Sequence, residues 1–103
     1  MEVSEFKHLE ITRPVAGVVL ARLNRPDVLN AVNTRLGQEI LDFFTFINSG
    51  ADADARCVVI TGAGERSFCV GGDLKERNGM TDAQWQAQRV VFKAYNLAME
   101  RCP

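Results

Sequence analysis

The sequence lacks the features that mark membrane-spanning, disulfide-bonded and nucleic-acid-binding proteins. No apolar run approaches the ~20 residues that cross a bilayer. The three cysteines are odd in number and have no metal-ligand spacing, so we expect reduced thiols and no metal. Twelve basic and thirteen acidic side chains give a net charge of -1, so no nucleic acid and no membrane surface is an expected partner. Residues 1–5 show no targeting signal, and we expect a cytoplasmic protein.

What the sequence does contain is typical of one soluble globular unit. Its 103 residues are 47% apolar and 24% charged, which excludes disordered, collagen-like and coiled-coil proteins. This length suffices for one domain or part of one and is too short for two. We therefore treat residues 1–103 as a single structural unit.

Hydrophobic patterning predicts an α/β protein. Residues 7–12 alternate as a half-buried strand does, whereas residues 18–23 and 57–60 are almost uniformly apolar, which predicts strands covered on both faces. The first two strands should form a hairpin. Between the second and third, Asn33 is a good N-cap for a helix that should end near Gly50. Strand, helix and strand in this order predict a parallel pair with a crossover helix.

The C-terminal third predicts two helices of unequal length. Asp73 can cap a short turn over residues 74–77, and Thr81 with Gln84 forms a capping box at the start of a helix of about 20 residues. Apolar residues at helical spacing predict one buried stripe on this second helix: Trp85, Phe92, Tyr95, Met99 and Cys102.

Few side chains offer chemistry of their own. His8 lies on the polar side of the first expected strand, so we interpret it as a surface histidine without a function. Cys69 is interpreted as a small residue that fills a tight site. The loop at residues 62–64 follows a strand, but it lacks the lysine and the third glycine of nucleotide-binding loops.

The segment Val70-Gly71-Gly72-Asp73 is more informative. Two adjacent glycines permit positive φ and a close approach of a ligand to the backbone. An N–H group just before a helical turn faces outward and can bind developing negative charge. The residues alone leave two interpretations open at Gly72: an oxyanion donor, or a plain strand-to-helix turn.

Four motifs together resemble one known family. They are residues 23–26 (LNRP), 29–33 (LNAVN), 59–64 (VITGAG) and 68–76 (FCVGGDLKE). In this order and at these spacings they resemble the N-terminal part of the enoyl-CoA hydratase/isomerase family, the crotonase superfamily. The resemblance runs from about residue 16 to residue 103.

The resemblance implies a spiral fold of β-β-α units and an acyl-CoA thioester as substrate. CoA is then part of the substrate, and no cofactor or metal is implied. Gly72 matches the first of two backbone N–H donors to the thioester oxygen, which makes it the expected catalytic position. Other positions match the path of CoA: Val28, Val70, Gly71, Asp73, Leu74 and Lys75. Arg25 and Lys75 are the basic residues nearest this path in sequence, and each either contacts a CoA phosphate or is simply solvated.

One departure from the family is large. The two acidic residues that the family's hydratases use would lie beyond residue 103, as would the second N–H donor. We therefore expect a truncated chain that is inactive alone, cut from an enoyl-CoA hydratase that forms trimers or hexamers. Three alternatives stay open: an isomerase or another crotonase-type acyl-CoA enzyme, a non-catalytic acyl-CoA-binding relative, and an unrelated α/β nucleotide-binding module.

Overall fold

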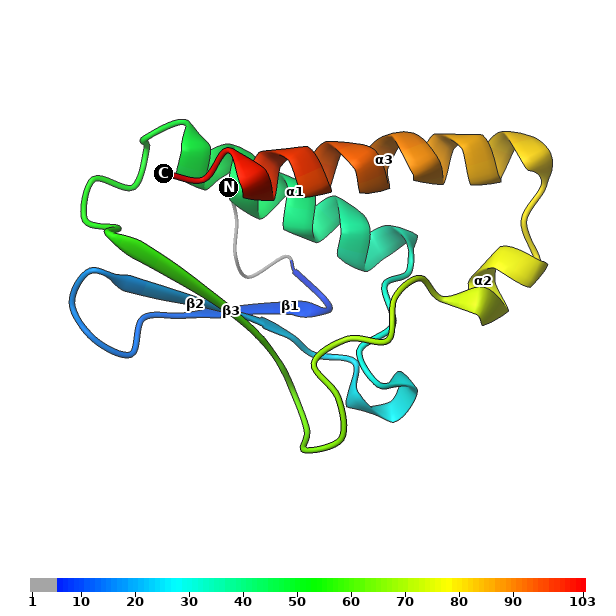
Figure 1. Ribbon diagram of the computed structural model, residues 1–103, viewed down its shortest axis with the longest axis horizontal. Coiled ribbons are helices and arrows are strands. Elements are labelled where there is room, and N and C mark those ends of the chain that lie inside the picture. The colour runs from blue at the N-terminus through cyan, green and yellow to red at the C-terminus, as the bar shows by residue number, and fades with distance from the viewer. Residues whose placement is uncertain (1–5) are drawn as a thin grey trace.

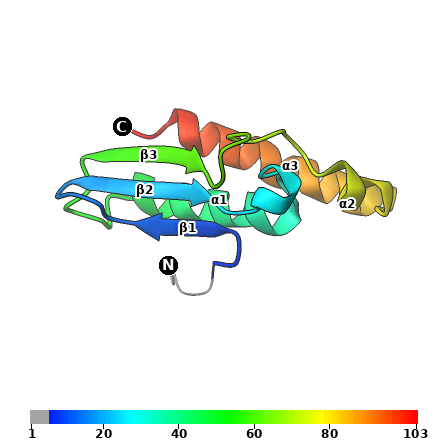
Figure 2. The ribbon, with the colours of Figure 1, turned by 90° about the horizontal axis from the view of Figure 1, so that it is seen from below.

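A three-stranded sheet lies beneath two helices in the computed structural model, which describes residues 6–103 (Figure 1). Residues 1–5, on which the expectation of no targeting signal rests, lie outside the described part. The strands β1 (Leu9–Thr12), β2 (Val18–Leu23) and β3 (Cys57–Gly62) stand side by side in that order (Figure 2). No helix among the described residues is long and apolar enough to cross a membrane.

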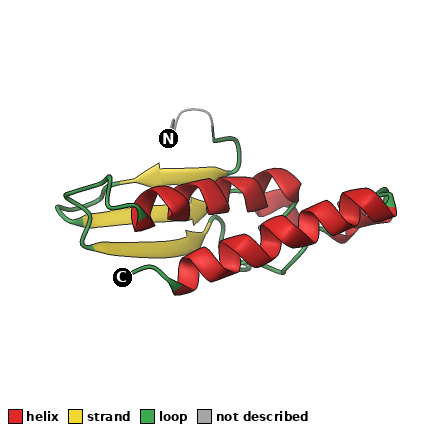
Figure 3. Ribbon diagram, turned by 90° about the horizontal axis from the view of Figure 1, so that it is seen from above, coloured by secondary structure: helices red, strands yellow, loops and turns green. Residues whose placement is uncertain are grey.

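The strand pairing confirms the expected topology. β1 and β2 form an antiparallel hairpin with Leu9 opposite Leu23. β2 and β3 are parallel, with Val18 opposite Cys57, and helix α1 (Thr34–Asn48) makes the crossover between them. Helix α3 (Asp82–Glu100) packs along α1, and its N-terminal half extends beyond the sheet (Figure 3).

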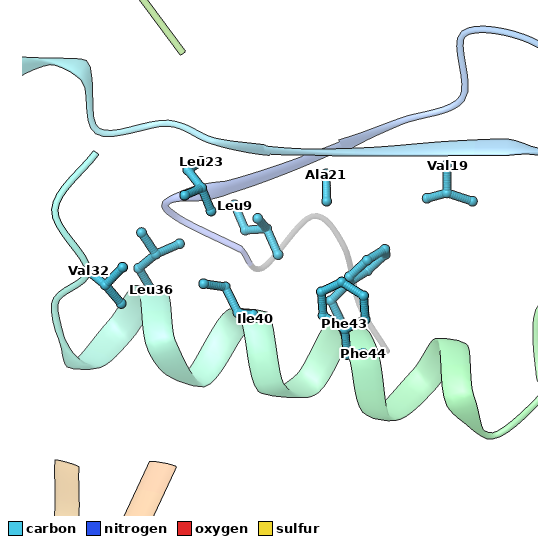
Figure 4. Packing of buried hydrophobic residues seen from close by; sticks show 9 residues of the cluster. All are labelled: Leu9, Val19, Ala21, Leu23, Val32, Leu36, Ile40, Phe43 and Phe44. Atoms are coloured by element: carbon cyan, nitrogen blue, oxygen red, sulfur yellow. The ribbon is translucent and has the colours of Figure 1, made fainter. Parts of the chain in front are cut away.

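The core lies between one face of the sheet and α1 (Figure 4). Alternate residues of β2 point into it, and they meet apolar side chains of α1 at helical spacing. The cluster consists of Leu9, Val19, Ala21, Leu23, Val32, Leu36, Ile40, Phe43 and Phe44. Burial of these side chains is the main apolar contribution to the stability of the sheet–helix pair.

The prediction that β2 and β3 are covered on both faces is wrong for the described residues. β2 alternates between buried and half-buried positions, and Val59 on β3 is 41% exposed. The helices cover only one face of the sheet, although a uniformly apolar strand is typical of burial on both. The opposite face, which carries Val59 and the Arg22–Glu10 ion pair, is not covered by a helix within the described residues.

The helix caps are confirmed. The side chain of Asn33 accepts from Leu36 N, and that of Asp73 accepts from Glu76 N at the start of α2 (Leu74–Asn78). Thr81 and Gln84 form the reciprocal capping box of α3. The apolar stripe is confirmed only in part, because Phe92, Tyr95, Met99 and Cys102 pack on the core whereas Trp85 is 38% exposed. Trp85 lies on the half of α3 that extends beyond the sheet.

The sheet begins later than predicted because a buried carboxylate takes the first N–H groups. β1 starts at Leu9 rather than at residue 7. Glu39 of α1, 2% exposed, accepts from the backbone N–H groups of residues 7, 8 and 9 at 2.7–2.9 Å, and Arg35 Nε donates to it at 2.7 Å. His8 is therefore not a strand residue but half-buried next to this carboxylate, and burial lowers its pKa.

We expect Glu39→Gln to lower the free energy of unfolding by about 2 kcal/mol. The glutamine NH₂ group is a donor, and it would face backbone N–H donors that now bind a carboxylate oxygen. Burial raises the pKa of Glu39, but the hydrogen bonds from residues 7–9 and Arg35 outweigh it and hold the pKa below the usual value. A carboxylate of this kind stabilises the fold above its unfolded pKa, and the contribution disappears as the pH falls through the lower folded value. Urea unfolding of the parent chain should therefore show stability falling below about pH 4, with a shallower fall in the variant. Equal pH dependence of the two chains would contradict this role.

Candidate functional site

Gly72 lies in a short parallel bridge with Val32, the residue two positions before α1. Val32 N donates to Gly71 O at 2.8 Å, and Asp73 N donates to Val32 O at 2.9 Å. In a parallel bridge of this pattern the middle residue directs its own N–H and C=O to the opposite side. The Gly72 N–H therefore points away from Val32, and no acceptor within residues 6–103 meets it. This geometry leaves one oriented backbone donor free.

The backbone on either side of this donor is held by local contacts. Gly71 has φ 97°, a left-handed conformation that favours glycine, and its N–H lies 3.4 Å from the Sγ atom of Cys69. Cys69 is half-buried against the core, in keeping with its interpretation as a small packing residue. After Gly72, the Asp73 side chain caps α2. Since α2 has only five residues, the orientation of the Gly72 N–H, rather than a helix dipole, is the stronger feature.

Arg25, in the motif at residues 23–26, binds the segment around Gly72 through its side chain. Its Nη1 donates to Ala31 O at 2.6 Å and to Asp73 Oδ2 at 3.1 Å, and both side chains of the ion pair are largely buried. Hydrogen bonding from Glu76 N and the Arg25 guanidinium keep the pKa of Asp73 below its usual value. The solvated interpretation of Arg25 therefore does not hold in this structure. The ion pair joins residues 48 positions apart in the sequence.

The remaining residues expected along the CoA path are on the surface. Val28 ends the short 3-10 helix η2 (Pro26–Val28), and Val70 and Leu74 stand on either side of Gly72 in sequence. All three are large apolar side chains with exposures between 41% and 70%, and Lys75 is exposed as well. The structure thus brings the segment around residues 25–32 beside residues 71–73 and leaves apolar side chains of both open to solvent.

Asn30 belongs to the motif at residues 29–33, and the sequence predicted no role for it. Its side chain is completely buried and joins two loops. Oδ1 accepts from Arg25 N at 2.8 Å, while Nδ2 donates to Ala63 O at 2.8 Å and to Ser67 O at 3.2 Å. Asn30 has φ 58°, in the left-handed region that asparagine tolerates better than most residues. The one signal in the sequence for a buried Asn30 was its position among the apolar residues of this motif.

Gly62, the last residue of β3, completes this junction. A Cβ atom there would lie 2.7 Å from Asn30 Nδ2 and 2.9 Å from the carbonyl carbon of Phe68. Only glycine fits at this position without displacing the 63–68 loop. The VITGAG and LNAVN motifs therefore meet through the contact between Gly62 and Asn30.

Comparisons with known proteins point to one family. Residues 18–100 match the family model described as enoyl-CoA hydratase/isomerase. The chain is 33% identical over 94 residues to a mevalonyl-coenzyme A hydratase from Beauveria bassiana, covering 91% of this chain and 30% of that protein. It is 37% identical over 68 residues to an (E)-benzylidenesuccinyl-CoA hydratase from Thauera aromatica, covering 66% of this chain and 25% of the relative.

Solved structures show the same similarity in three dimensions. An enoyl-CoA hydratase from Bacillus anthracis superposes with a TM-score of 0.87 at 33% identity, over 94% of this chain and 37% of that one. A putative enoyl-CoA hydratase from Streptomyces coelicolor gives 0.82 at 27% identity, over 100% and 38%. The chain spans less than two fifths of the length of these relatives and matches the N-terminal part of the crotonase fold. On this similarity of sequence and fold, the chain belongs to the enoyl-CoA hydratase/isomerase family.

Proposed function

We propose that this chain supplies the thioester-binding part of an enoyl-CoA hydratase active site, with the Gly72 N–H as one of two donors to the substrate's carbonyl oxygen. The observation that carries this proposal is the direction of that N–H. Its two neighbours make the bridge to Val32, so the Gly72 donor has no structural bond to break when a ligand arrives. An oriented donor of this kind costs little reorganisation when charge develops.

The proposed reaction adds water across the Cα–Cβ double bond of a 2-enoyl-CoA thioester. Hydroxide adds at Cβ and a proton at Cα, and the negative charge passes through the thioester oxygen as an enolate. A backbone N–H stabilises the enolate oxygen more strongly than the ground-state carbonyl, by about 3–4 kcal/mol per donor. The same donor would serve double-bond isomerisation, which proceeds through an enolate too.

The acid and base of this reaction are proposed to lie outside the chain, together with the second donor. Two acidic side chains near the core are already engaged in structural contacts. Glu39 binds the N–H groups of residues 7–9, and Glu76 Oε1 accepts from Thr34 N and Oγ1 and from Gln88 Nε2. A carboxylate held in this way is poorly placed to move a proton.

We further propose that CoA lies over the exposed side chains of Val28, Val70 and Leu74. The backbone of Gly71 and Asp73 would contact it as well, and Lys75 or Arg25 would face its phosphates. The mevalonyl-CoA and (E)-benzylidenesuccinyl-CoA hydratases differ in acyl group, so membership of the family leaves the acyl chain open. The assembly proposed for the complete enzyme is a trimer or hexamer, in the cytoplasm.

Equilibrium binding tests this proposal. We expect the chain to bind crotonyl-CoA in a calorimetric titration more tightly than free CoA, since only crotonyl-CoA has a thioester carbonyl oxygen that can accept from Gly72. We also expect no hydration of crotonyl-CoA above the buffer background, because one donor without an acid and base leaves most of the barrier in place. Binding of ATP or NAD without binding of crotonyl-CoA would favour a nucleotide-binding module instead. Turnover by the chain would contradict the placement of the acid and base.

A further inference from the structure

A cationic hollow lies beside the Gly72 segment, between the end of α2 and the projecting half of α3. Its volume is about 520 Å³. Three of its lining side chains are cations (Arg77, Arg89 and Lys93), two are aromatic (Trp85 and Phe92), and none is acidic. The whole chain carries more acidic than basic residues, so this arrangement does not follow from composition. Arg89 and Lys93 are also like charges four residues apart on one helix face, which disfavours the helix.

Arg77 reaches from this hollow to Gly72. An ideal Cβ atom at Gly72 would lie 2.6 Å from Arg77 Cζ, so the guanidinium fills the space that a side chain there would need. It also lies over the Phe92 ring, 5.7 Å from the centroid. The guanidinium therefore sits against the Cα atom next to the proposed donor nitrogen, and it lines the hollow at the same time.

A buried amide fixes the position of this guanidinium. Arg77 Nε donates to Gln88 Oε1 at 3.2 Å, and Gln88 is 2% exposed. Gln88 Nε2 is held in turn by Thr34 Oγ1 at 3.0 Å and Glu76 Oε1 at 2.8 Å. Glu76 is the nearby carboxylate, but its Oε1 atom is occupied by Thr34 and Gln88 and makes no ion pair with Arg77.

The charges of the hollow have no acidic partner within residues 6–103. Arg77 uses Nε on Gln88, and Arg89 Nη1 donates to Gln86 Oε1 and stacks over Trp85 at 4.8 Å from the ring centroid. None of the ion pairs among the described residues includes Arg77, Arg89 or Lys93. A planar guanidinium with free N–H groups is suited to bidentate binding of a carboxylate.

We propose that this hollow receives a carboxylate carried on the acyl group of the substrate, so that Arg77 selects dicarboxylic acyl-CoA thioesters. The inference rests on the proposed function, because it takes Gly72 as the site of the thioester carbonyl. An anionic group in the hollow has two possible sources, the acyl chain and the phosphates of CoA. The contact between Arg77 and Gly72 favours the acyl chain, since the thioester carbonyl would lie at Gly72 and the phosphates lie at the far end of the pantetheine arm.

The test compares glutaryl-CoA with pentanoyl-CoA, which have the same five-carbon acyl chain and differ in a terminal carboxylate. Free CoA is the third ligand. Trp85 lines the hollow and is the sequence's one tryptophan, so its fluorescence reports occupancy, and calorimetry gives the affinity. The 103-residue chain is compared with Arg77→Gln and with Lys93→Gln, whose side chain is exposed and whose replacement should leave the fold intact. Arg56→Gln removes one exposed cation that donates to Ala53 O, outside the hollow, and is the matched control.

We expect glutaryl-CoA to bind at least about tenfold more tightly than pentanoyl-CoA, as one charge-assisted contact allows. Both hollow variants should lose most of this preference and keep their affinity for pentanoyl-CoA, while Arg56→Gln retains the preference. Equal binding of the two esters, or a preference that persists in Arg77→Gln, would overturn the inference and leave the proposed function standing. If free CoA alone changes Trp85 fluorescence as strongly as glutaryl-CoA, the hollow binds phosphate and the inference is wrong. Failure to bind either ester would overturn the proposed function and this inference with it.

Discussion

Replacing Gly72 by proline should lower kcat of the complete enzyme about 100- to 1,000-fold while acyl-CoA binding remains measurable. Proline removes the N–H proposed to bond the enolate oxygen, and this N–H takes no part in the bridge to Val32. The structural bonds at this point belong to Gly71 O and Asp73 N, which the substitution leaves in place. Binding should suffer less than kcat, because other residues are proposed to hold CoA and the donor acts most strongly in the transition state.

Gly72→Ala is the matched variant, because it retains the N–H. Gly72 does not have positive φ, so alanine can adopt its backbone conformation. Its Cβ atom would displace the Arg77 guanidinium, which is the end of a flexible side chain. We therefore expect substantial activity in Gly72→Ala, with kcat and acyl-CoA affinity measured side by side for both variants. A proline variant with near-normal kcat would remove Gly72 from the mechanism.

Asn30→Ala should lower the free energy of unfolding by about 4 kcal/mol, a large part of the stability of a domain this size. The substitution deletes three hydrogen bonds and leaves the buried Ala63 carbonyl without the amide that it now binds. It also places alanine at φ 58°, where asparagine is better tolerated. Urea unfolding followed by circular dichroism measures the loss.

Two further variants separate the causes of this loss. Asn30→Gly removes the same side chain but accepts positive φ, so it should be about 1 kcal/mol more stable than Asn30→Ala. Asn96→Ala removes an exposed amide on α3 that donates to Phe92 O, and its stability should change by less than about 0.5 kcal/mol. If Asn30→Ala were no less stable than Asn96→Ala, the Asn30 junction would not hold the loops together.

Local signals in the sequence predicted the order and ends of the elements well. The caps at Asn33, Asp73 and Thr81 each depend on a side chain and the backbone N–H three residues later, so a short stretch of sequence contains both partners. The hairpin and the parallel crossover followed from element order, and the pairing confirms both.

Features that depend on distant partners could not be predicted in this way. The carboxylate of Glu39 delays the start of β1 across some 30 residues, and nothing in residues 7–9 reveals it. Covering of β2 and β3 depends on which elements surround the sheet, whereas the apolar pattern indicates only that burial suits them. The same limit applies to Asn30, whose amide bonds the loop more than 30 residues later.

The sequence predicted the position of the candidate donor and an outward-facing N–H group, but not the contacts that leave this group free. The glycine pair at residues 71 and 72 indicated where a donor is possible. Whether that donor is free depends on the bridge to Val32, which is 40 residues away and has no motif of its own. The contact between Arg77 and Gly72 depends on the buried Gln88 and was equally invisible in the sequence.

The most direct measurement is the amide proton and nitrogen resonance of Gly72 in the 103-residue chain during titration with crotonyl-CoA, with free CoA as the control. The proposed hydrogen bond predicts a downfield shift of the Gly72 proton that saturates with the ester and that free CoA does not reproduce. Shifts of Val28, Val70 and Leu74 should appear with both ligands, because those residues are proposed to contact CoA itself. A Gly72 amide that does not move while crotonyl-CoA binds would contradict the assignment of this N–H to the thioester oxygen.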